Sequence, residues 1–285
     1  MAAIRFLTQT GQRCNDKREE FILLSGVQHA SHCITQHVTC PTPDILGVSA
    51  LVDAINHHNA AGATESTVLG PFHVNHDVMM PLWGNISEGQ AGSASFVSGK
   101  VLDTEGQPVA GVLMDFWQTD GEKGSTPPNP WKSSFANCFS MLKLVTQTLS
   151  PPPGVYDVQL DGEYKMFGRG HFRTDKNGAY GFRHVKPIPY PIPTDGPVGD
   201  MLSRMGRHPM RPAHIHAILA CEGFRPLTTH IFLKGDPYNH SDTVFGVKES
   251  LIVDFVEHPP GPTPDGGVSQ EPFFTAEFNF VIARK

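Results

Sequence analysis

Two histidines separated by one residue lie inside an apolar, β-branched run, His214-Ile-His216-Ala-Ile-Leu. Side chains alternate along a strand with period two, so both imidazoles are expected on the same face. Upstream, Tyr190 stands between two prolines, whose fixed φ angles stiffen the loop and aim the phenol. Imidazole and phenolate ligands with few thiols nearby favour a hard, oxidised ion such as Fe(III) over zinc or copper. These residues therefore predict a metal site.

Each of these features also has an ordinary structural explanation. A His-x-His pair on a strand is commonly half-buried polarity, and a tyrosine between prolines commonly packs on a core. Two other functions therefore stay open: a non-catalytic β-sandwich binding module, and a zinc hydrolase that uses His214 and His216 with a carboxylate. Colour separates them, because tyrosinate bound to Fe(III) makes a protein wine-red, whereas zinc-bound or metal-free protein is colourless.

Composition limits the class of protein. A chain of 285 residues usually forms one large or two small domains. The 25 prolines, 28 glycines and 18% charged residues indicate many turns, as in an all-β protein. The net charge of −6 and the lack of a basic patch argue against nucleic-acid binding. Five irregularly spaced cysteines and the lack of a long apolar run predict a cytoplasmic protein with no disulfide framework and no membrane span.

The periodicity of apolar residues predicts a few helices and many strands. Three-to-four spacing indicates amphipathic helices over 16–25 and 44–56. Short β-rich segments bounded by turn residues then follow, with hairpin turns predicted at 103–106 and 175–178. The expected strands are 96–103, 109–117, 213–220, 228–233 and 278–283. We therefore predict a mainly β protein, with a β-sandwich catalytic core and a truncated N-terminal helical part.

Several longer stretches resemble one enzyme family. They are Ala63-Thr-Glu-Ser-Thr-Val-Leu-Gly-Pro-Phe-His-Val, 99–111, Asp115-Phe-Trp-Gln-Thr-Asp, Gly154-Val-Tyr-Asp-Val-Gln, Gly170-His-Phe-Arg-Thr-Asp and 185–217. Together they resemble the intradiol ring-cleavage dioxygenases, non-haem Fe(III) enzymes that open catechols between the two hydroxyls. Thr229-His-Ile-Phe and Ser241-Asp-Thr-Val-Phe-Gly-Val-Lys are most similar to the hydroxyquinol 1,2-dioxygenase group of that family.

The resemblance also implies a domain organisation. It divides the chain into an N-terminal helical segment, 1–62, and a β-sandwich Fe(III) domain, 63–285. Segments 26–43 and 125–153 have no counterpart in the family pattern, so we expect insertions there, either translated introns or genuine loop extensions. The first insertion contains His29, His32, Cys33, His37 and Cys40, whose spacing would also suit a zinc site. In the family the N-terminal helices form a homodimer contact and hold a phospholipid, and this chain begins late relative to that pattern.

The metal ligands follow from the resemblance residue by residue. It implies one Fe(III) per chain, held by Tyr156, Tyr190, His214 and His216. Tyr164 is the rival for the position of Tyr156, but it lacks the flanking Gly-x and Asp-x-Gln. Two phenolates and a hydroxide balance the charge of Fe(III), and a neutral cluster avoids the desolvation penalty of a buried ion. By the same resemblance Tyr190 leaves the metal when substrate binds, and Arg211 stabilises developing negative charge.

The resemblance places seven residues in the substrate pocket: Leu23, Asp44, Val68, Pro71, Phe72, Phe245 and Gly246. Asp44 could accept a hydrogen bond from a third ring hydroxyl that catechol lacks, although its position also suits a helix N-cap. His230 stands where catechol dioxygenases tend to carry Gln. The implied reaction is the cleavage of hydroxyquinol (benzene-1,2,4-triol) by O2 to 3-hydroxy-cis,cis-muconate, which tautomerises to maleylacetate, in aromatic compound catabolism. Catechol is the alternative substrate.

Overall fold

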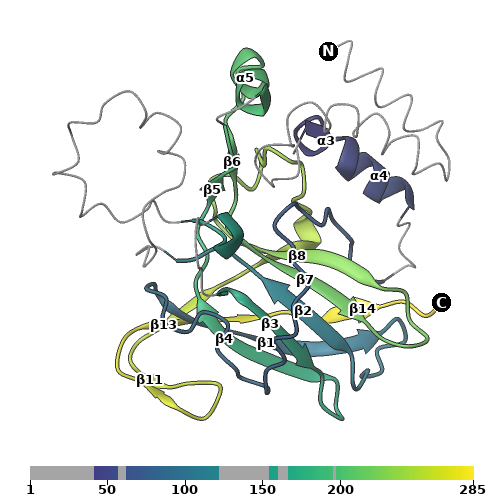
Figure 1. Ribbon diagram of the computed structural model, residues 1–285. Coiled ribbons are helices and arrows are strands. Elements are labelled where there is room, and N and C mark those ends of the chain that lie inside the picture. Colours follow the sequence, from purple (N-terminus) through teal and green to yellow (C-terminus); the bar gives the residue numbers. More distant parts are fainter. Residues whose placement is uncertain (1–41, 57–61, 122–153, 160–165, 195–196) are drawn as a thin grey trace.

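The computed structural model describes residues 42–56, 62–121, 154–159, 166–194 and 197–285 (Figure 1). Several predictions fall outside these ranges, namely the helix over 16–25, residues 26–41 of the first insertion with its histidines and cysteines, the second insertion, Leu23 and Tyr164. None of the helices in the described ranges combines the length and apolar character needed to cross a membrane.

Two five-stranded sheets form the body of the molecule (Figure 1). In the first sheet, β1 pairs antiparallel with β4 on one edge and parallel with β13 and β14 on the other, and β10 extends β13. In the second sheet the order is β3-β2-β7-β8-β9, antiparallel except for the last pair. The bounds of the first sheet are β1 Ala94–Asp103, β4 Ala179–Val185, β10 Val256–His258, β13 Phe273–Glu277 and β14 Phe280–Ile282. Those of the second are β2 Leu113–Trp117, β3 Arg169–Arg173, β7 His214–Ala220, β8 Leu227–Leu233 and β9 Ile252–Val253.

The apolar core lies between the two sheets. Because side chains alternate along a strand, each strand of the second sheet presents every other residue to this core. On β7 these are Ile215, Ala217 and Leu219, which are at most 1% exposed. They pack in one cluster with residues of the first sheet such as Val97 and Phe182. This arrangement confirms the predicted mainly β sandwich.

The two predicted hairpin turns form, but they do not make hairpins within one sheet. The turn at 103–106 closes through the Gly106 N–H and the Asp103 carbonyl (2.9 Å). The chain then leaves β1 and enters β2, which belongs to the other sheet. The turn at 175–178 likewise connects β3 to β4 across the sandwich. Residues 107–109 turn back beside the end of β1, where Leu102 and Pro108 form an antiparallel bridge and the Val109 N–H donates to the Val101 carbonyl (2.8 Å). The rest of the predicted strand over 109–117 does not continue along β1 but joins the other sheet as β2, since local turn chemistry does not decide which sheet a strand joins.

Short helices and a two-stranded ribbon cover the outer side of the second sheet (Figure 1). The predicted helix over 44–56 is divided into α3, Thr42–Ile45, and α4, Val48–Asn56, because Gly47 adopts a positive φ of 74°. The ribbon consists of β5, Tyr190–Pro191, and β6, Met210–Arg211, and it carries α5 at its far end. The remaining elements are α5 Pro197–Arg204, η3 Asp157–Gln159, η4 Glu249–Leu251, β11 Gly261–Pro262 and β12 Val268–Ser269.

Candidate metal centre and substrate cleft

Two imidazole nitrogens and two phenol oxygens converge on the outer face of the second sheet. His214 Nε2 and His216 Nε2 lie 3.1 Å apart. Tyr156 Oη is 3.0 Å from His216 Nε2 and 3.4 Å from His214 Nε2, and Tyr190 Oη is 3.4 Å from Tyr156 Oη. All four side chains are at most 2% exposed. The structure thus brings together the four residues that the sequence predicts as metal ligands.

Each of the four comes from an element that fixes its direction. The two histidines occupy alternate positions of β7, opposite in phase to the core residues on that strand. Tyr190 begins β5, which is paired with β6 through Arg211. Tyr156 precedes η3, and its backbone N–H donates to Gln159 Oε1 (2.8 Å). The backbone at Gly70 can lie close to the His216 ring because Gly70 has no side chain. A Cβ at this position would lie 3.1 Å from that ring.

The spacing of these atoms fits one bound metal ion. Ligand atoms about 2.0 to 2.2 Å from an ion stand roughly 3.0 to 3.5 Å from one another, which is the spacing observed. His214 Nδ1 donates to the Pro212 carbonyl (2.7 Å), so its Nε2 offers a lone pair to the centre. Among the described residues, His216 Nδ1 has no hydrogen-bond partner. Two phenols and two imidazoles at this separation make a donor set suited to an oxidised, hard ion.

Without a cation, burial opposes charge on Tyr156, His214 and His216. Burial and the neighbouring Tyr190 phenol raise the pKa of Tyr156 well above its usual range. Burial, together with the positive charge of Arg211, lowers the pKa of His214 well below its usual range. The imidazoles are therefore neutral and able to bind a metal. A bound cation would reverse the effect on the phenols by stabilising phenolate.

Arg211 connects this centre to a buried carboxylate. Its Nη1 lies 3.4 Å from Tyr190 Oη and 3.2 Å from His214 Nε2, while its Nε donates to Asp242 Oδ1 (3.2 Å). Burial disfavours the charge of Arg211, but the Asp242 carboxylate together with the phenols of Tyr190 and Tyr156 raises the pKa of Arg211 above its usual range. Asp242 also accepts the backbone N–H of Gly246 (2.9 Å). The guanidinium is thus a fixed, permanently charged group beside the predicted ligands.

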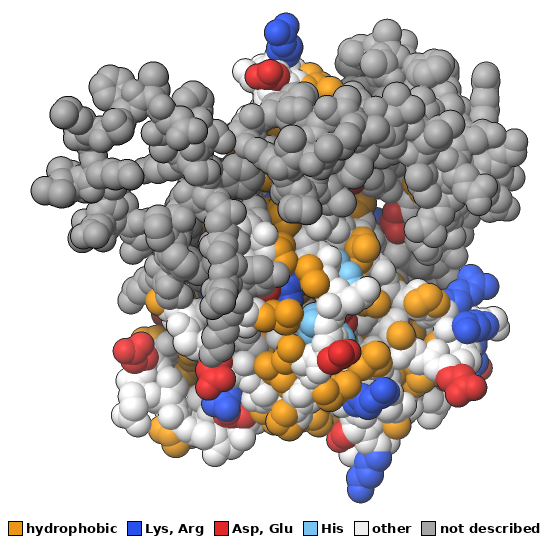
Figure 2. All heavy atoms as spheres, in the orientation of Figure 1, with side chains coloured by type: hydrophobic (Ala, Val, Ile, Leu, Met, Phe, Trp, Pro, Cys, Tyr) orange, Lys and Arg blue, Asp and Glu red, His pale blue; other side chains and the backbone are white. Residues whose placement is uncertain are grey.

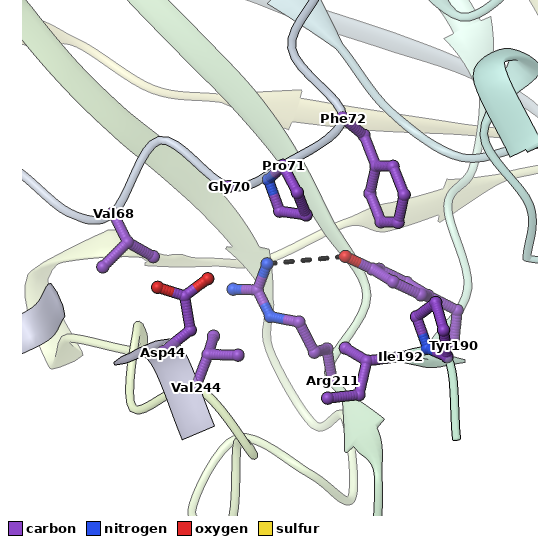
Figure 3. A pocket seen from close by; sticks show the side chains of 10 residues that line it. Asp44, Val68, Gly70, Pro71, Phe72, Tyr190, Ile192, Arg211 and Val244 are labelled. Atoms are coloured by element: carbon purple, nitrogen blue, oxygen red, sulfur yellow. Dashed lines mark hydrogen bonds between the residues drawn. The ribbon is translucent and has the colours of Figure 1, made fainter. Parts of the chain in front are cut away.

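A cleft opens next to Tyr190 and Arg211 (Figure 3). Its lining residues are Asp44, Val68, Gly70, Pro71, Phe72, Tyr190, Ile192, Pro193, Arg211 and Val244. In Figure 3 the Asp44 carboxylate points toward the Arg211 guanidinium, and Phe72 and Tyr190 lie on the opposite side. Burial raises the pKa of Asp44, although a hydrogen bond from Ser49 and the charge of Arg211 oppose this shift. The cleft is therefore an apolar slot that contains one carboxyl group, one guanidinium and one phenol.

Four of the seven residues predicted for the pocket wall line this cleft: Asp44, Val68, Pro71 and Phe72. Asp44 lies within α3 and does not cap a helix that starts at 45, because Gly47 interrupts that helix. Phe245 has a positive φ of 58° and is 51% exposed, with its ring under the Arg207 guanidinium. Gly246 packs against Arg211, which leaves no room for a side chain. Gly246 thus borders the cleft's arginine and Phe245 contacts Arg207, and neither residue lines the cleft.

Several residues support the centre through contacts that the sequence analysis did not predict. The Trp117 ring stacks on the His216 ring, with centroids 4.5 Å apart. The His230 ring lies 4.1 Å from that of His216, and His230 Nδ1 bonds to Thr67 Oγ1 (2.6 Å). His214, His216 and His230 together also form a group of three metal-capable imidazoles. Cross-strand pairing explains the arrangement, since Trp117, His216 and His230 are register partners on three adjacent strands.

A buried ion pair anchors the segment that carries Tyr156. Arg169 Nε donates to Asp157 Oδ2 (2.8 Å), and Arg169 Nη2 donates both to Asp157 Oδ1 (2.6 Å) and to the Phe72 carbonyl (2.7 Å). The Phe72 ring in turn stacks on the Tyr156 ring, with centroids 4.6 Å apart. One arginine thus joins a ligand-bearing segment to the cleft wall. The sequence shows Asp157 beside Tyr156, but Arg169 becomes its partner only in the folded chain.

Comparisons with known proteins show the family to which the chain belongs. The family described as "Dioxygenase" matches residues 149–283, and "Catechol dioxygenase N terminus" matches residues 1–64. Hydroxyquinol 1,2-dioxygenase of Rhizobium sp. (strain MTP-10005) is 45% identical over 287 residues, covering 100% of this chain and 80% of the relative. That of Rhodococcus opacus is 40% identical over 285 residues, covering 99% and 78%.

A solved structure shows the same likeness in three dimensions. The hydroxyquinol 1,2-dioxygenase of Pseudomonas putida DLL-E4 superposes with a TM-score of 0.69 at 37% identity, covering 100% of this chain and 82% of that one. Sequence identity of this extent over most of both chains, together with the shared fold, places the chain in one family. The protein belongs to the intradiol ring-cleavage dioxygenases.

Proposed function

We propose that the protein cleaves hydroxyquinol between adjacent hydroxyls with O2, giving 3-hydroxy-cis,cis-muconate and then maleylacetate, and that it uses one Fe(III) per chain. Iron dependence is the norm of the family to which the chain belongs. The observation that carries the proposal is the convergence of two phenol and two imidazole atoms beside a cleft lined by Asp44 and Arg211. The names of the relatives support the choice of substrate.

Tyr156, Tyr190, His214 and His216 would hold the ion, and the ion would activate the bound substrate toward O2. Of the two phenols, only Tyr190 lines the cleft. We assign to it the exchange with substrate, in which its released Oη takes one proton from a substrate hydroxyl. No further general base is then needed for that proton. Arg211 is held by Asp242 with its charge toward Tyr190, so it can stabilise the negative charge that develops on the substrate.

Asp44 gives the cleft a preference for a third hydroxyl. Its carboxylate enters a wall otherwise formed by apolar side chains such as Val68 and Val244, so a substrate that leaves it unpaired binds at a cost. A site built to hydrogen-bond a hydroxyl rejects the analogue without it more strongly than an apolar pocket does. This acid therefore favours hydroxyquinol over catechol.

The division at residues 62 and 63, the two insertions and a cytoplasmic location stay predictions, as does assembly into a homodimer. The segment that would form the family's dimer contact falls largely in residues 1–41, outside the described ranges. Light scattering on the purified chain distinguishes monomer from dimer directly.

The test is oxygen uptake by iron-loaded protein with hydroxyquinol and with catechol, together with the visible spectrum. We expect a wine-red protein that consumes one O2 for each hydroxyquinol and a higher kcat/KM for hydroxyquinol than for catechol. A coloured protein that prefers catechol would support the proposed iron centre but contradict hydroxyquinol as the substrate. A colourless protein that consumes no O2 with either substrate would favour a binding module or a zinc enzyme.

Two variants assign the roles within this reaction. Tyr190→Phe should keep part of the iron, shift the visible band and lose turnover, because the exchanging phenol is gone; full activity with an unchanged spectrum would contradict the role of Tyr190. Asp44→Ala should lower kcat/KM for hydroxyquinol about tenfold more than for catechol. Equal losses on both substrates would remove the hydrogen-bonding role and leave Asp44 a structural residue.

A further inference from the structure

A second cluster of metal-capable side chains lies on the same outer face, one row of residues away from the metal centre. Asp115 and His171 are cross-strand partners on β2 and β3, and Trp117 and Arg169 are the next outward-facing pair. His76 comes from the loop after the cleft wall. Ligand atoms of His76, Asp115 and His171 all lie within 4.8 Å of one another. No step proposed for ring cleavage uses any of the three.

The distances within this cluster are those of a metal polyhedron. His76 Nε2 lies 3.3 Å from Asp115 Oδ1, and His171 Nε2 lies 3.4 Å from Asp115 Oδ2. Ligand atoms about 2.0 to 2.1 Å from a tetrahedral zinc ion stand about 3.3 Å apart. His73 Nε2 also contacts Asp115 Oδ2 (2.9 Å), although His73 is not among the three residues whose ligand atoms all lie within 4.8 Å of one another. Three imidazoles thus surround one carboxylate.

Polar atoms in the cluster lack the hydrogen bonds that a purely structural role would supply. His76 Nε2 and Asp115 Oδ1 are buried and face each other at 3.3 Å, and within the described part of the chain neither has another polar partner. The His76 side chain is 1% exposed. Leaving buried polar groups unpaired costs about 1 to 3 kcal/mol. A bound cation would satisfy both atoms at once.

The cluster is also held rigidly. The His171 N–H donates to the Val78 carbonyl (2.8 Å), and the Met80 N–H donates to the His171 carbonyl (2.8 Å), so the loop that carries His76 is fastened to β3. The His76 and His171 rings stack with centroids 4.2 Å apart, which points both Nε2 atoms to one carboxylate. On the face in view, Figure 2 shows pale-blue histidine side chains at the surface among hydrophobic ones. His73 and His171 are 18% and 16% exposed, which gives an ion a path of entry.

We propose that His76, His171 and Asp115 form a three-ligand binding site for a divalent transition-metal ion of the zinc class, separate from the iron centre. Neutral imidazoles and one carboxylate are ligands that zinc accepts in tetrahedral sites. The site carries net charge of +1 with its ion bound, and two of its ligands face solvent. Its role is to fasten the loop over residues 73–80, which continues from the cleft wall, to the strands β2 and β3.

A hydrogen bond to His76 determines which nitrogen of its ring carries the proton before a metal binds. The Val78 N–H donates to His76 Nδ1 (3.2 Å), so the proton of the neutral ring is on Nε2. For His76 Nε2 to bind the ion, the proton moves to Nδ1 and that long bond opens, so the ring stays neutral. His171 makes no hydrogen bond through its ring among the described residues and meets no such cost. Zinc uptake should weaken as pH falls, because protons compete with the ion for the imidazole nitrogens.

The test uses Zn2+ and protein whose catalytic centre is already loaded with iron. After equilibrium dialysis, both metals are measured for the wild-type protein and for the double variant Asp115→Asn, His171→Gln. We expect about one zinc per wild-type chain with iron retained, and at least ~100-fold weaker zinc binding in the double variant. His208→Gln is the matched control, because His208 is also a partly buried histidine whose Nδ1 accepts a backbone N–H (3.1 Å from Met210).

Anomalous scattering at the zinc edge, from wild-type crystals soaked in Zn2+, locates the ion even if the double variant does not fold. Density between His76, Asp115 and His171 supports the site. Zinc that only replaces iron, binds elsewhere, or fails to bind the wild-type chain overturns it. Equal binding by wild type and a folded double variant overturns it as well. Wine-red colour and oxygen uptake are followed separately, so a failure of the proposed reaction is not mistaken for a failure of this site.

Discussion

The two faces of the second sheet use the same strands for opposite purposes. On β7, Ile215, Ala217 and Leu219 enter the apolar core, whereas His214 and His216 between them face the metal centre. On β2, Phe116 packs inward while Trp117 stacks on His216. The inner face gains free energy by removing apolar surface from water. The outer face buries imidazoles, phenols and a guanidinium, which costs free energy unless a cation and hydrogen bonds compensate.

Along these strands, residues that stabilise the core and residues that form the metal centre occupy alternate positions. Because the strand period is two, a shift of one position would exchange the core with the metal ligands. Substitutions on the inner face should therefore reduce stability, while the molecules that still fold keep their metal binding and activity. Changes on the outer face should abolish metal binding or activity with smaller effects on folding. Four substitutions test this separation.

The largest effect is expected on the outer face. His216→Asn should reduce bound iron and oxygen uptake by more than ~100-fold, because a ligand is lost and the Trp117 stack is disturbed. The unfolding free energy of the iron-free protein should fall by less than about 2 kcal/mol, since surrounding groups lose little packing. Iron analysis and urea unfolding of the metal-free protein measure the two quantities. Retention of iron with a large loss of stability would reverse the comparison.

On the inner face, Phe116→Ala should lower the unfolding free energy by about 3 to 5 kcal/mol. The Phe116 ring lies between both sheets, 4.4 Å from the Phe182 ring and 6.0 Å from the Phe172 ring. We expect the remaining folded protein to keep its iron content and visible band. The readouts are chemical denaturation and the ratio of visible to protein absorbance. A folded variant that has lost its colour would show that the two faces are not independent.

An intermediate case is the ion pair that anchors Tyr156. Arg169→Met leaves the buried charge of Asp157 with only the Val158 N–H as a partner among the described residues, and loss of one partner of a buried pair costs about 3 kcal/mol. It also releases the Phe72 carbonyl, so we expect a shifted visible band and a raised KM. The double variant Arg169→Met, Asp157→Asn should recover part of the stability, because no charge is left unpaired. If the double variant is less stable than Arg169→Met, the charge of Asp157 has another partner.

The smallest effect concerns Asp44 and depends on pH. Because burial raises its pKa, the folded state holds the Asp44 proton more tightly than the unfolded state does. Its contribution to stability is thus present at low pH and is lost as pH rises from the ordinary value of about 4 through the raised value. Asp44→Asn should raise Tm at pH 7 by no more than about 2 °C, with the difference vanishing near pH 4. A variant less stable than wild type at pH 7 would contradict this sign.

Much of the fold was accessible from short-range patterns. Alternation placed strands over 213–220 and 228–233, and the structure has β7 and β8 there. The same alternation put His214 and His216 on one face, because it depends only on neighbours in sequence. Turn residues located the bends at 103–106 and 175–178. The bends did not predict which sheet the next strand joins, since that is decided by burial of the strand's whole face.

The partners of the predicted ligands, in contrast, were decided only by the tertiary structure. The family resemblance named Tyr156 and Tyr190, but no sequence pattern aligns Trp117, His216 and His230 in one row, because that row requires the order β2-β7-β8 and its register. Asp242 likewise meets Arg211 across 31 residues through a loop that folds back on the ribbon. Sequence determines which side of its own strand a residue faces, since that is a local property of the backbone. Which residue it meets there depends on sheet order and on the free energy of closing long loops, which are properties of the whole chain.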